Sequence, residues 1–246
     1  MDIRFRDFFI ERYRQYFNQA ELPITFEYTD DERGVKLAKP TVETRCFIAA
    51  LQSVREGHSL RFDAHSIGCA GGRYYCGFSP RLRTGIAEFL SHDEHGEGER
   101  YKKTPEMAAE VIRQTPWREA PAAYLLAKRW DRLGESDQPQ VVAFFAVPDV
   151  LSGLFTLAGF DEADRDASVT APFSAGCGSI VLAPFAERRS DHPRAVLGMF
   201  DVSARPYVPA HTLTLAIPLQ KFRTMVENMD ESFLITESWR KVQGRI

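Results

Sequence analysis

The second half of the chain alternates short apolar runs with segments of helical character, and this alternation limits the folds that the chain can adopt. The apolar runs of strand length are residues 124–130, 141–147, 169–173, 195–200 and 213–217. Helices are predicted between and after them, at 149–159 following Pro148, from Gly176 onward, and over 218–245. Nearly continuous apolar runs indicate strands that are covered on both faces. The pattern therefore predicts an α/β fold in which helices cover a mixed sheet.

The first half carries the same two kinds of segment in a less regular order. Aromatic side chains at helical spacing over residues 5–17 predict an amphipathic opening helix. Further expected elements are strands at 24–28, 35–38 and 60–62 and a helix over 41–56. From 79 to 140, helical pieces alternate with polar loops. One of these loops, 92–100, is rich in histidine, acidic residues and glycine, and it predicts a solvated mobile flap rather than a metal site.

The length and the charge of the chain narrow its organisation and its partners. With 246 residues the chain can bury a full core, so we expect residues 1–246 to form a single globular α/β domain, with two small packed halves as the alternative. The 31 basic and 34 acidic side chains give a formal net charge of -3. Because this charge provides no long-range positive field, we expect neither nucleic acid nor an anionic membrane as a partner. The sequence leaves the oligomeric state open.

The location is predicted from the N-terminus and the cysteines. Charges at Asp2 and Arg4 interrupt the apolar stretch that a signal peptide requires. No segment approaches the roughly 20 apolar residues that cross a bilayer, so we predict a cytoplasmic protein. The cysteines are too few and too irregularly spaced for a secreted disulfide scaffold, so they are expected to be reduced. They are Cys46, Cys69, Cys76 and Cys177.

Two stretches of the chain share an order of features that indicates an internal repeat. Pro40 and Pro148 each precede the cysteine of a Gly-Cys pair by 29 positions. In both stretches the predicted order is strand, proline, helix, short strand, Gly-Cys and helix. We interpret residues 35–78 and 141–186 as a degenerate duplication of two pseudo-equivalent β-α-β halves. Chance spacing is the alternative, because the chain has 14 prolines and four cysteines.

Each Gly-Cys pair is expected to lie where a glycine-rich turn enters a helix. A thiol there is close to unpaired backbone N–H groups and to the positive end of the helix dipole, which favour the thiolate and can also bind a carboxylate or phosphate. We take Cys69 and Cys177 as candidate catalytic residues that face each other across a cleft. The candidate ligand-binding residues are Gly68, Gly71, Gly72, Arg73, Gly176, Gly178 and Ser179. The predicted ligand is a small anionic molecule, which the Arg73 guanidinium and the Ser179 hydroxyl would contact.

Packing accounts for the same residues without any chemistry. Free cysteine is often buried as a small hydrophobe, and glycine supplies backbone freedom alone. Cys46, inside the predicted helix 41–56, and Cys76, among aromatic residues, are assigned to packing. The chain has no Cys-x-x-Cys pair, Walker loop, Rossmann glycine fingerprint or Gly-x-Ser-x-Gly elbow. The standard zinc, nucleotide and hydrolase signatures are therefore absent from the sequence.

Several short motifs together carry a resemblance to a known family. They are residues 68–75 (GCAGGRYY), 147–149 and 151–153 (VPD and LSG), 176–180 (GCGSI), 200–201 and 203–205 (FD and SAR), and 228–233. Over nearly its whole length the chain resembles the uncharacterised ArCR family, also called domain of unknown function 169. The resemblance implies no activity, but its Gly-Cys motifs coincide with the candidate site. The position of Cys76 is expected to be apolar in that family, so the resemblance gives this cysteine no ligand role.

Three hypotheses follow from these cysteines. The first is a small-molecule site in which Cys69 and Cys177 act as a thiol-dependent enzyme, by analogy with cofactor-independent racemases and other isomerases that use two cysteines. The alternative is an iron-sulfur or metal-binding protein for electron transfer or sensing, which would use the same cysteines with Cys46 as a third ligand. The third is a scaffold in which the thiols affect only stability. The sequence leaves the substrate, the cofactor and the metal unknown.

Overall fold

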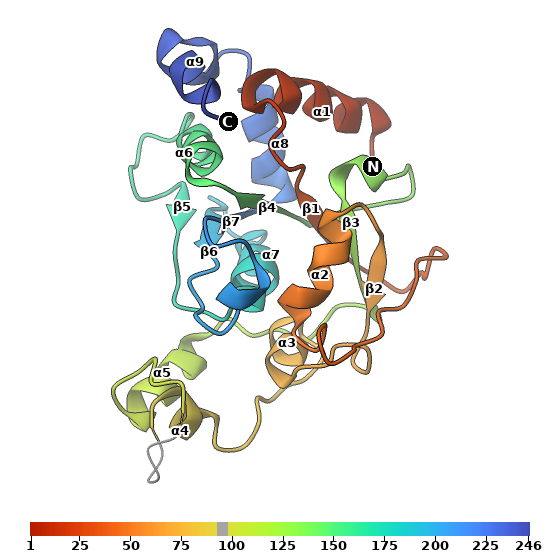
Figure 1. Cartoon of the computed structure of the whole chain (residues 1–246), viewed down its shortest axis with the longest axis vertical. Helices are drawn as coiled ribbons and strands as arrows, with labels where there is room; N and C mark the ends of the chain where they lie inside the picture. Colours follow the sequence, from red (N-terminus) through yellow and green to blue (C-terminus); the bar gives the residue numbers. More distant parts are fainter. Residues whose placement is uncertain (93–97) are drawn as a thin grey trace.

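The structure of the chain is a computed structural model that describes residues 1–92 and 98–246. These residues form a seven-stranded mixed open sheet in the order β2-β3-β1-β4-β7-β6-β5 (Figure 1). The strands are β1 (Ile24–Thr29), β2 (Leu60–Phe62), β3 (Tyr124–Arg129), β4 (Val141–Ala146), β5 (Val169–Thr170), β6 (Ala195–Gly198) and β7 (Leu213–Pro218). The pair β5 and β6 is parallel, and the other neighbouring pairs are antiparallel. The centre of the predicted flap, 93–97, lies outside the described residues.

Strand β4 lies in the middle of the sheet, and each of its six residues is buried. Side chains of a strand alternate between its two faces. Val141, Ala143 and Phe145 accordingly belong to one hydrophobic core, and the residues that alternate with them belong to the other. Helices must therefore cover both faces of the sheet, as the continuous apolar run predicted.

One face of the sheet is covered by four helices whose apolar residues fill the second core. They are α1 (Ile3–Phe17), α6 (Pro148–Ala158), α8 (Leu219–Glu227) and α9 (Glu237–Gln243). In Figure 1, α1 and α9 lie together at the top, where the Trp239 indole N–H donates to the Tyr16 carbonyl at 2.9 Å. Among the described residues, no helix has the length and apolar character that a membrane crossing requires.

The opposite face is covered by shorter helical pieces. They are α2 (Phe47–Arg55) and a helix that begins at Gly176, runs through the π-helical segment η2 (Gly178–Leu182) and continues as α7 (Ala183–Glu187). Next to them lies α3 (Ala70–Tyr75), while α4 (Ile86–Leu90) and α5 (Pro105–Gln114) form a lobe away from the sheet (Figure 1). The 3-10 turns are η1 (Trp130–Arg132), η3 (Arg205–Tyr207) and η4 (Phe233–Ile235). Helices thus lie on both faces, and the predicted α/β fold class is confirmed.

The first half departs from the prediction at its second helix and second strand. Helix α2 begins six residues later than position 41, because Thr41 and Thr44 each accept the other's backbone N–H with a hydroxyl, at 2.9 and 3.2 Å. Such side-chain bonds compete with helix formation. The predicted strand at 35–38 is reduced to a single bridge between Leu37 and Arg61.

The predicted duplication is not shown by the structure. Residues 35–78 and 141–186 share an order of elements, but the elements take different places. In the first segment Leu37 is bridged directly to β2, whereas in the second β4 is separated from β5 by β7 and β6. The equal proline-to-cysteine spacing therefore does not correspond to equivalent positions in the sheet.

A glycine in α6 allows the close approach of the helices on the four-helix face. A Cβ on Gly153 would overlap Trp239 Cη2 and lie 2.8 Å from Phe17 Cε1, and both rings are buried. We expect Gly153→Ala to lower the free energy of unfolding by about 1 to 3 kcal/mol in urea denaturation. Gly71→Ala in α3 is the control, because a Cβ there meets no described atom within 4 Å. Helix propensity should make that control neutral or stabilising by up to about 1 kcal/mol. Equal losses in the two variants would contradict the packing argument.

Candidate functional site

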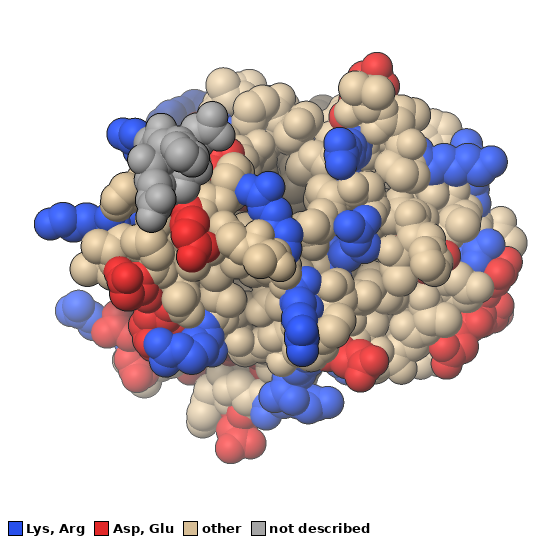
Figure 2. Space-filling view, turned by 90° about the horizontal axis from the view of Figure 1, so that it is seen from below, with Lys and Arg blue, Asp and Glu red and all other residues tan. Residues whose placement is uncertain are grey.

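A cavity of about 740 Å³ opens on the α2 side of the sheet. Its walls are the N-terminal ends of α2 and α3, the start of the helix at Gly176, the loop after β6, and segments 82–90 and 99–101. Figure 2 looks onto the end of the molecule that carries α3 to α5 and shows a hollow there with basic side chains beside it. The walls are largely apolar, and three of the four cysteines line them. A mostly apolar cavity of this size with a few polar groups is typical of small-molecule sites.

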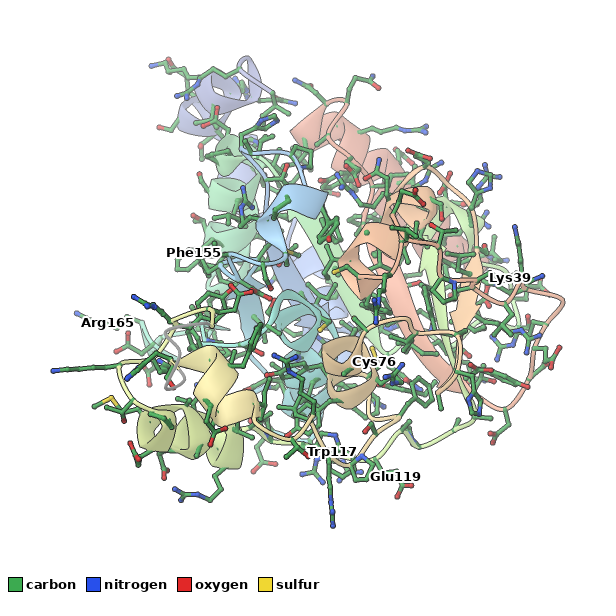
Figure 3. The ribbon with its side chains drawn as sticks, turned by 60° about the horizontal axis from the view of Figure 1, so that its bottom comes forward. Lys39, Cys76, Trp117, Glu119, Phe155 and Arg165 are labelled. Carbon is green, nitrogen blue, oxygen red and sulfur yellow. The ribbon has the colours of Figure 1, made fainter. Side chains whose placement is uncertain are left out.

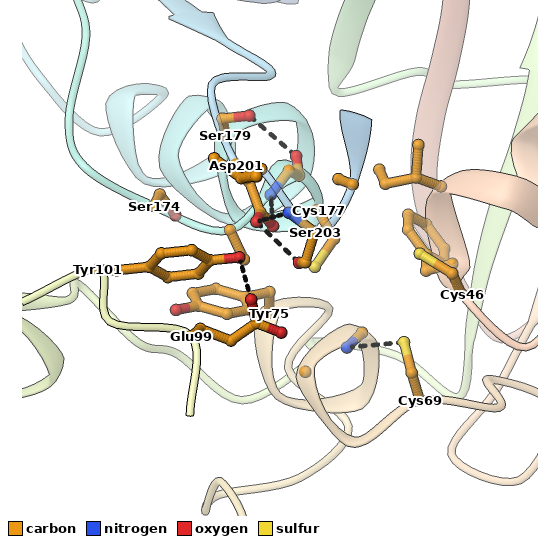
Figure 4. A pocket seen from close by; sticks show the side chains of 18 of the residues that line it. Cys46, Cys69, Tyr75, Glu99, Tyr101, Ser174, Cys177, Ser179, Asp201 and Ser203 are labelled. Carbon is orange, nitrogen blue, oxygen red and sulfur yellow. Dashed lines mark hydrogen bonds between the residues drawn. The ribbon is translucent and has the colours of Figure 1, made fainter. Parts of the chain in front are cut away.

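Cys69 caps the N-terminus of α3 with its sulfur. Its backbone is extended, with φ -106° and ψ 143°, and its Sγ accepts the Gly72 backbone N–H at 3.3 Å (Figure 4). The absence of a side chain at Gly72 makes this approach possible. A Cβ there would lie 2.9 Å from the Cys69 sulfur and 3.0 Å from Phe47 Cβ. The glycine that follows the cysteine at this spacing is therefore part of how the thiol is held.

Cys46 lies at the start of α2, next to Cys69. The two chain segments touch at Gly68, where a Cβ would lie 2.9 Å from the Arg45 carbonyl oxygen and 2.9 Å from Pro40 Cβ. Of its neighbours, the Cys46 thiol has the largest effect on the pKa of Cys69, and it lowers that pKa. The placement of Cys46 inside a helix is wrong, because α2 begins after this residue, but its assignment to packing agrees with its contact with the core on this face. The Thr41 and Thr44 pair is the signal that would have shortened the predicted helix.

The mutual influence of these two thiols shifts their pKa values in opposite directions. Cys46, acting as a donor toward the Cys69 sulfur, lowers the pKa of Cys69 to about 6, and the N–H groups of Phe47 and Gly72 act in the same direction against the opposing effect of burial. The same interaction and burial raise the pKa of Cys46, which keeps its proton as the donor. Cys69 is therefore the thiolate of the pair, in the direction expected for a thiol at a helix start.

Cys177 reaches the same cavity from the first turn of the helix that begins at Gly176. Burial raises its pKa well above that of an ordinary thiol, and the negative charges of Cys69 and Asp201 act in the same direction. The expectation of an acidic thiol at this helix start is therefore wrong, because desolvation outweighs the N–H groups. Cys177 is therefore a neutral thiol in the cavity, as Cys46 is.

The Asp201 side chain caps the start of the helix that begins at Gly176. Its Oδ2 accepts the Gly176 N–H at 3.0 Å, and its Oδ1 accepts the Ser203 N–H at 3.0 Å and hydroxyl at 2.8 Å (Figure 4). The carboxylate thus occupies the place that we predicted for an anionic ligand at the second Gly-Cys pair. Sequence reasoning missed this role, although an aspartate two residues before a serine is a signal of such a turn.

The structure brings most of the predicted site residues to the cavity but not all of them. Those that line it are Cys69, Gly71, Gly72, Gly176, Cys177 and Ser179. Gly68, Arg73 and Gly178 do not line it. The Arg73 Nη1 donates to the Ile67 carbonyl at 2.9 Å, so its guanidinium supports the turn before α3. A Cβ on Gly178 would overlap the Ser174 hydroxyl, which shows a packing requirement.

The Ser179 side chain also has an internal partner, since its hydroxyl donates to the Gly176 carbonyl at 2.8 Å. Two arginines that the sequence did not single out, Arg45 and Arg83, line the cavity instead. Both are exposed, and the Arg83 guanidinium lies 3.9 Å from the centroid of the Phe89 ring. No sequence signal marked either of them, because their place depends on contacts between distant segments.

Cys76 stays apart from the cavity. It is fully buried at the end of α3 (Figure 3), and the Tyr28 hydroxyl donates to its carbonyl at 3.0 Å. Burial raises the pKa of its thiol well above the ordinary value. Its assignment to packing agrees with these contacts.

The metal-binding alternative receives no support from the described residues. Within 1–92 and 98–246, no group of three or more His, Cys, Asp and Glu side chains is arranged to hold a metal ion. Cys46, Cys69 and Cys177 line one cavity without forming such a group.

Comparison with known proteins places the chain in a family but assigns it no activity. The model of the family described as uncharacterised ArCR, domain of unknown function 169, matches residues 15–228. No curated protein and no solved structure matches the chain.

The lowered pKa of the Cys69 thiol can be measured by alkylation. Because the thiolate is the reactive form, the rate of iodoacetamide labelling at Cys69 should rise with pH through a midpoint at about 6 and exceed the rates at Cys76 and Cys177. Cys46→Ala removes the donor, so the midpoint should rise toward the value of about 8.5 for free cysteine. Cys46→Ser keeps a donor and should shift it less. Peptide mass spectrometry over a pH series measures the rates, and an unchanged midpoint in Cys46→Ala would contradict the role of Cys46.

Proposed function

The chain belongs to the uncharacterised ArCR family, and because this membership assigns no activity, we propose a function from the chemistry of the cavity. The protein is a thiol-dependent enzyme that moves a proton to and from a carbon atom of a small anionic molecule, as a cofactor-independent isomerase does. Cys69 is the base, and Cys177 is the proton donor.

The observation that carries this proposal is the opposite protonation of two thiols in one cavity. The pKa of Cys69 is lowered and that of Cys177 is raised, so at neutral pH one is a thiolate and the other a thiol. A pair of groups whose environments separate their pKa values is the arrangement that general acid-base catalysis requires. The largely apolar walls give the reacting groups a less polar environment than bulk water, which strengthens their electrostatic interactions.

The reaction needs no oxidant and no second substrate. The Cys69 thiolate takes a proton from a carbon next to a carboxylate or carbonyl, and the electron pair moves toward that carbonyl oxygen. Cys177 then gives its proton to the carbon from its own side of the cavity, which inverts the configuration. The product leaves with Cys69 protonated and Cys177 ionised, and proton exchange with solvent restores the starting state.

Two features of the cavity support an anionic ligand with an apolar body. Arg45 and Arg83 are exposed cations on its wall, and neither forms an ion pair with a described residue. Phe173 and Phe200 also line the cavity and are 54% and 56% exposed, so apolar surface is available for a ligand to cover. We therefore assign the ligand head group to the arginines and its body to the aromatic side chains.

Proton exchange at carbon tests the reaction. We would incubate the reduced protein in D2O with chiral carboxylic acids that carry an apolar group on the α-carbon, and follow deuterium incorporation by NMR. Cys69→Ser and Cys177→Ser should each slow exchange by at least about 100-fold, since general acid-base catalysis contributes about 10²- to 10⁴-fold.

The control for this experiment is Cys76→Ala, which lies outside the cavity and should keep the exchange rate within a few fold. Circular dichroism checks that each variant is folded. Exchange that persists in both serine variants would contradict the proposal, and so would a wild-type protein that binds such acids but exchanges none of them.

Binding of an anionic apolar probe tests the ligand assignment separately. The fluorescence of 8-anilinonaphthalene-1-sulfonate should rise as it enters the cavity. Arg45→Ala and Arg83→Ala should each raise its Kd roughly fivefold, the equivalent of about 1 kcal/mol for an exposed charge pair. Arg165→Ala is the matched control, because this exposed arginine lies at the periphery in Figure 3 and does not line the cavity. Equal affinities in all three variants would remove the arginines from the proposed site.

A further inference from the structure

We propose that Cys46 and Cys69 are a peroxide-sensitive thiol pair that closes to an intrachain disulfide and so removes the Cys69 thiolate from the cavity. The proposed isomerase chemistry uses Cys69 and Cys177 and gives no task to Cys46 beyond its effect on the pKa of Cys69. Oxidation of this pair would therefore be a second reaction at the same cavity, and it requires no isomerase substrate.

The geometry brings the two cysteines together at the starts of two consecutive helices. Cys46 directly precedes α2, and Cys69 directly precedes α3. The two segments approach closely before and after the cysteines: a Cβ on Gly68 would lie 2.9 Å from the Arg45 carbonyl oxygen, and a Cβ on Gly72 would lie 3.0 Å from Phe47 Cβ. Both side chains line the same cavity where these two segments meet, so a reactive species formed at one sulfur is close to the other.

The two cysteines are also the ones that a small oxidant can reach. Cys46 and Cys69 are partly exposed, whereas Cys76 and Cys177 are buried. Both members of the pair line the cavity, which is wide enough to admit hydrogen peroxide (Figure 4). Oxidation follows thiolate character and access, and Cys69 combines them.

The oxidant is a hydroperoxide, and the reaction proceeds in two balanced steps. The Cys69 thiolate attacks one peroxide oxygen, the O–O bond breaks, and hydroxide leaves, so the sulfur becomes a sulfenic acid and the peroxide is reduced. The Cys46 sulfur then attacks the Cys69 sulfur, the S–O bond breaks, and the thiol proton leaves with the hydroxyl group as water. The disulfide that forms is reversed by a dithiol reductant.

Oxidation of Cys69 makes the Cys46 thiol easier to ionise, and an ionised Cys46 can form the disulfide. Its raised pKa comes first from the interaction with the Cys69 thiolate, and oxidation of Cys69 removes that anion. The N–H groups of Ile48 and Ala49 at the start of α2 then favour its thiolate. The pair therefore has the two members that a redox couple needs, a thiolate that reacts first and a neighbouring thiol that resolves it.

Peptide mapping tests the pair in the full chain. The reduced protein would be treated with one equivalent of hydrogen peroxide, quenched with N-ethylmaleimide and digested without reductant. We expect a cross-linked peptide that joins Cys46 to Cys69 in the wild type, its loss on treatment with dithiothreitol, and unmodified Cys76. In Cys46→Ser the sulfenic acid at Cys69 should persist and be trapped by dimedone.

One control variant tests whether Cys177 takes part in the cross-link. Cys177→Ala should retain the cross-link, which excludes Cys177 as the resolving thiol, and the wild-type map alone decides the proposal if a variant does not fold. A cross-link from Cys69 to Cys177, or oxidation of wild-type Cys69 to sulfinic acid without any cross-link, would overturn it. Because the measurement is of mass, it stands or falls separately from the exchange of protons at carbon.

Discussion

The burial of β4 on both faces is the constraint on which the rest of the structure depends. A strand whose six residues are all buried requires a layer on each side of the sheet, because no face of it can be left to solvent. Four helices fill one side with a core rich in large aromatic rings, including Phe9, Trp130 and Phe222. The other side is covered by shorter pieces and loops, and it is on that side that the cavity opens.

Close packing of two chain segments at glycine residues determines which side chains line that cavity. Gly68 and Gly72 let the start of α3 pack against the start of α2, and this contact brings two thiols and the N–H groups of two helix starts to one place. A larger residue at either position would separate the segments, since its Cβ would meet backbone or Cβ atoms of residues 40–47 at 2.9 to 3.0 Å. The acidity of Cys69 is thus a result of packing between chain segments more than 20 residues apart.

The two candidate catalytic thiols share a sequence context and differ in environment. Each follows a glycine and lies at the start of a helix, so the helix dipole acts on both in the same sense. At Cys69 a thiol donor and backbone N–H groups outweigh burial. At Cys177 burial dominates, and Asp201 already accepts the N–H of the first residue of the helix. Opposite protonation follows from these neighbours and not from the Gly-Cys motif, and it is what an acid-base pair needs.

The sequence by itself determined the α/β fold class, the buried central strand and the position of Cys69 at a helix start, because periodicity and glycine-rich turns act locally. It assigned Cys46 to packing and Arg73 to a ligand, and it extended a helix back to residue 41. Tertiary structure alone decided that Cys46 and Cys69 meet at one cavity, that Arg73 turns to the Ile67 carbonyl, and that Arg45 lines the cavity. The physical reason is that desolvation, interactions between thiols and cavity walls arise from contacts between distant segments, which local spacing does not encode.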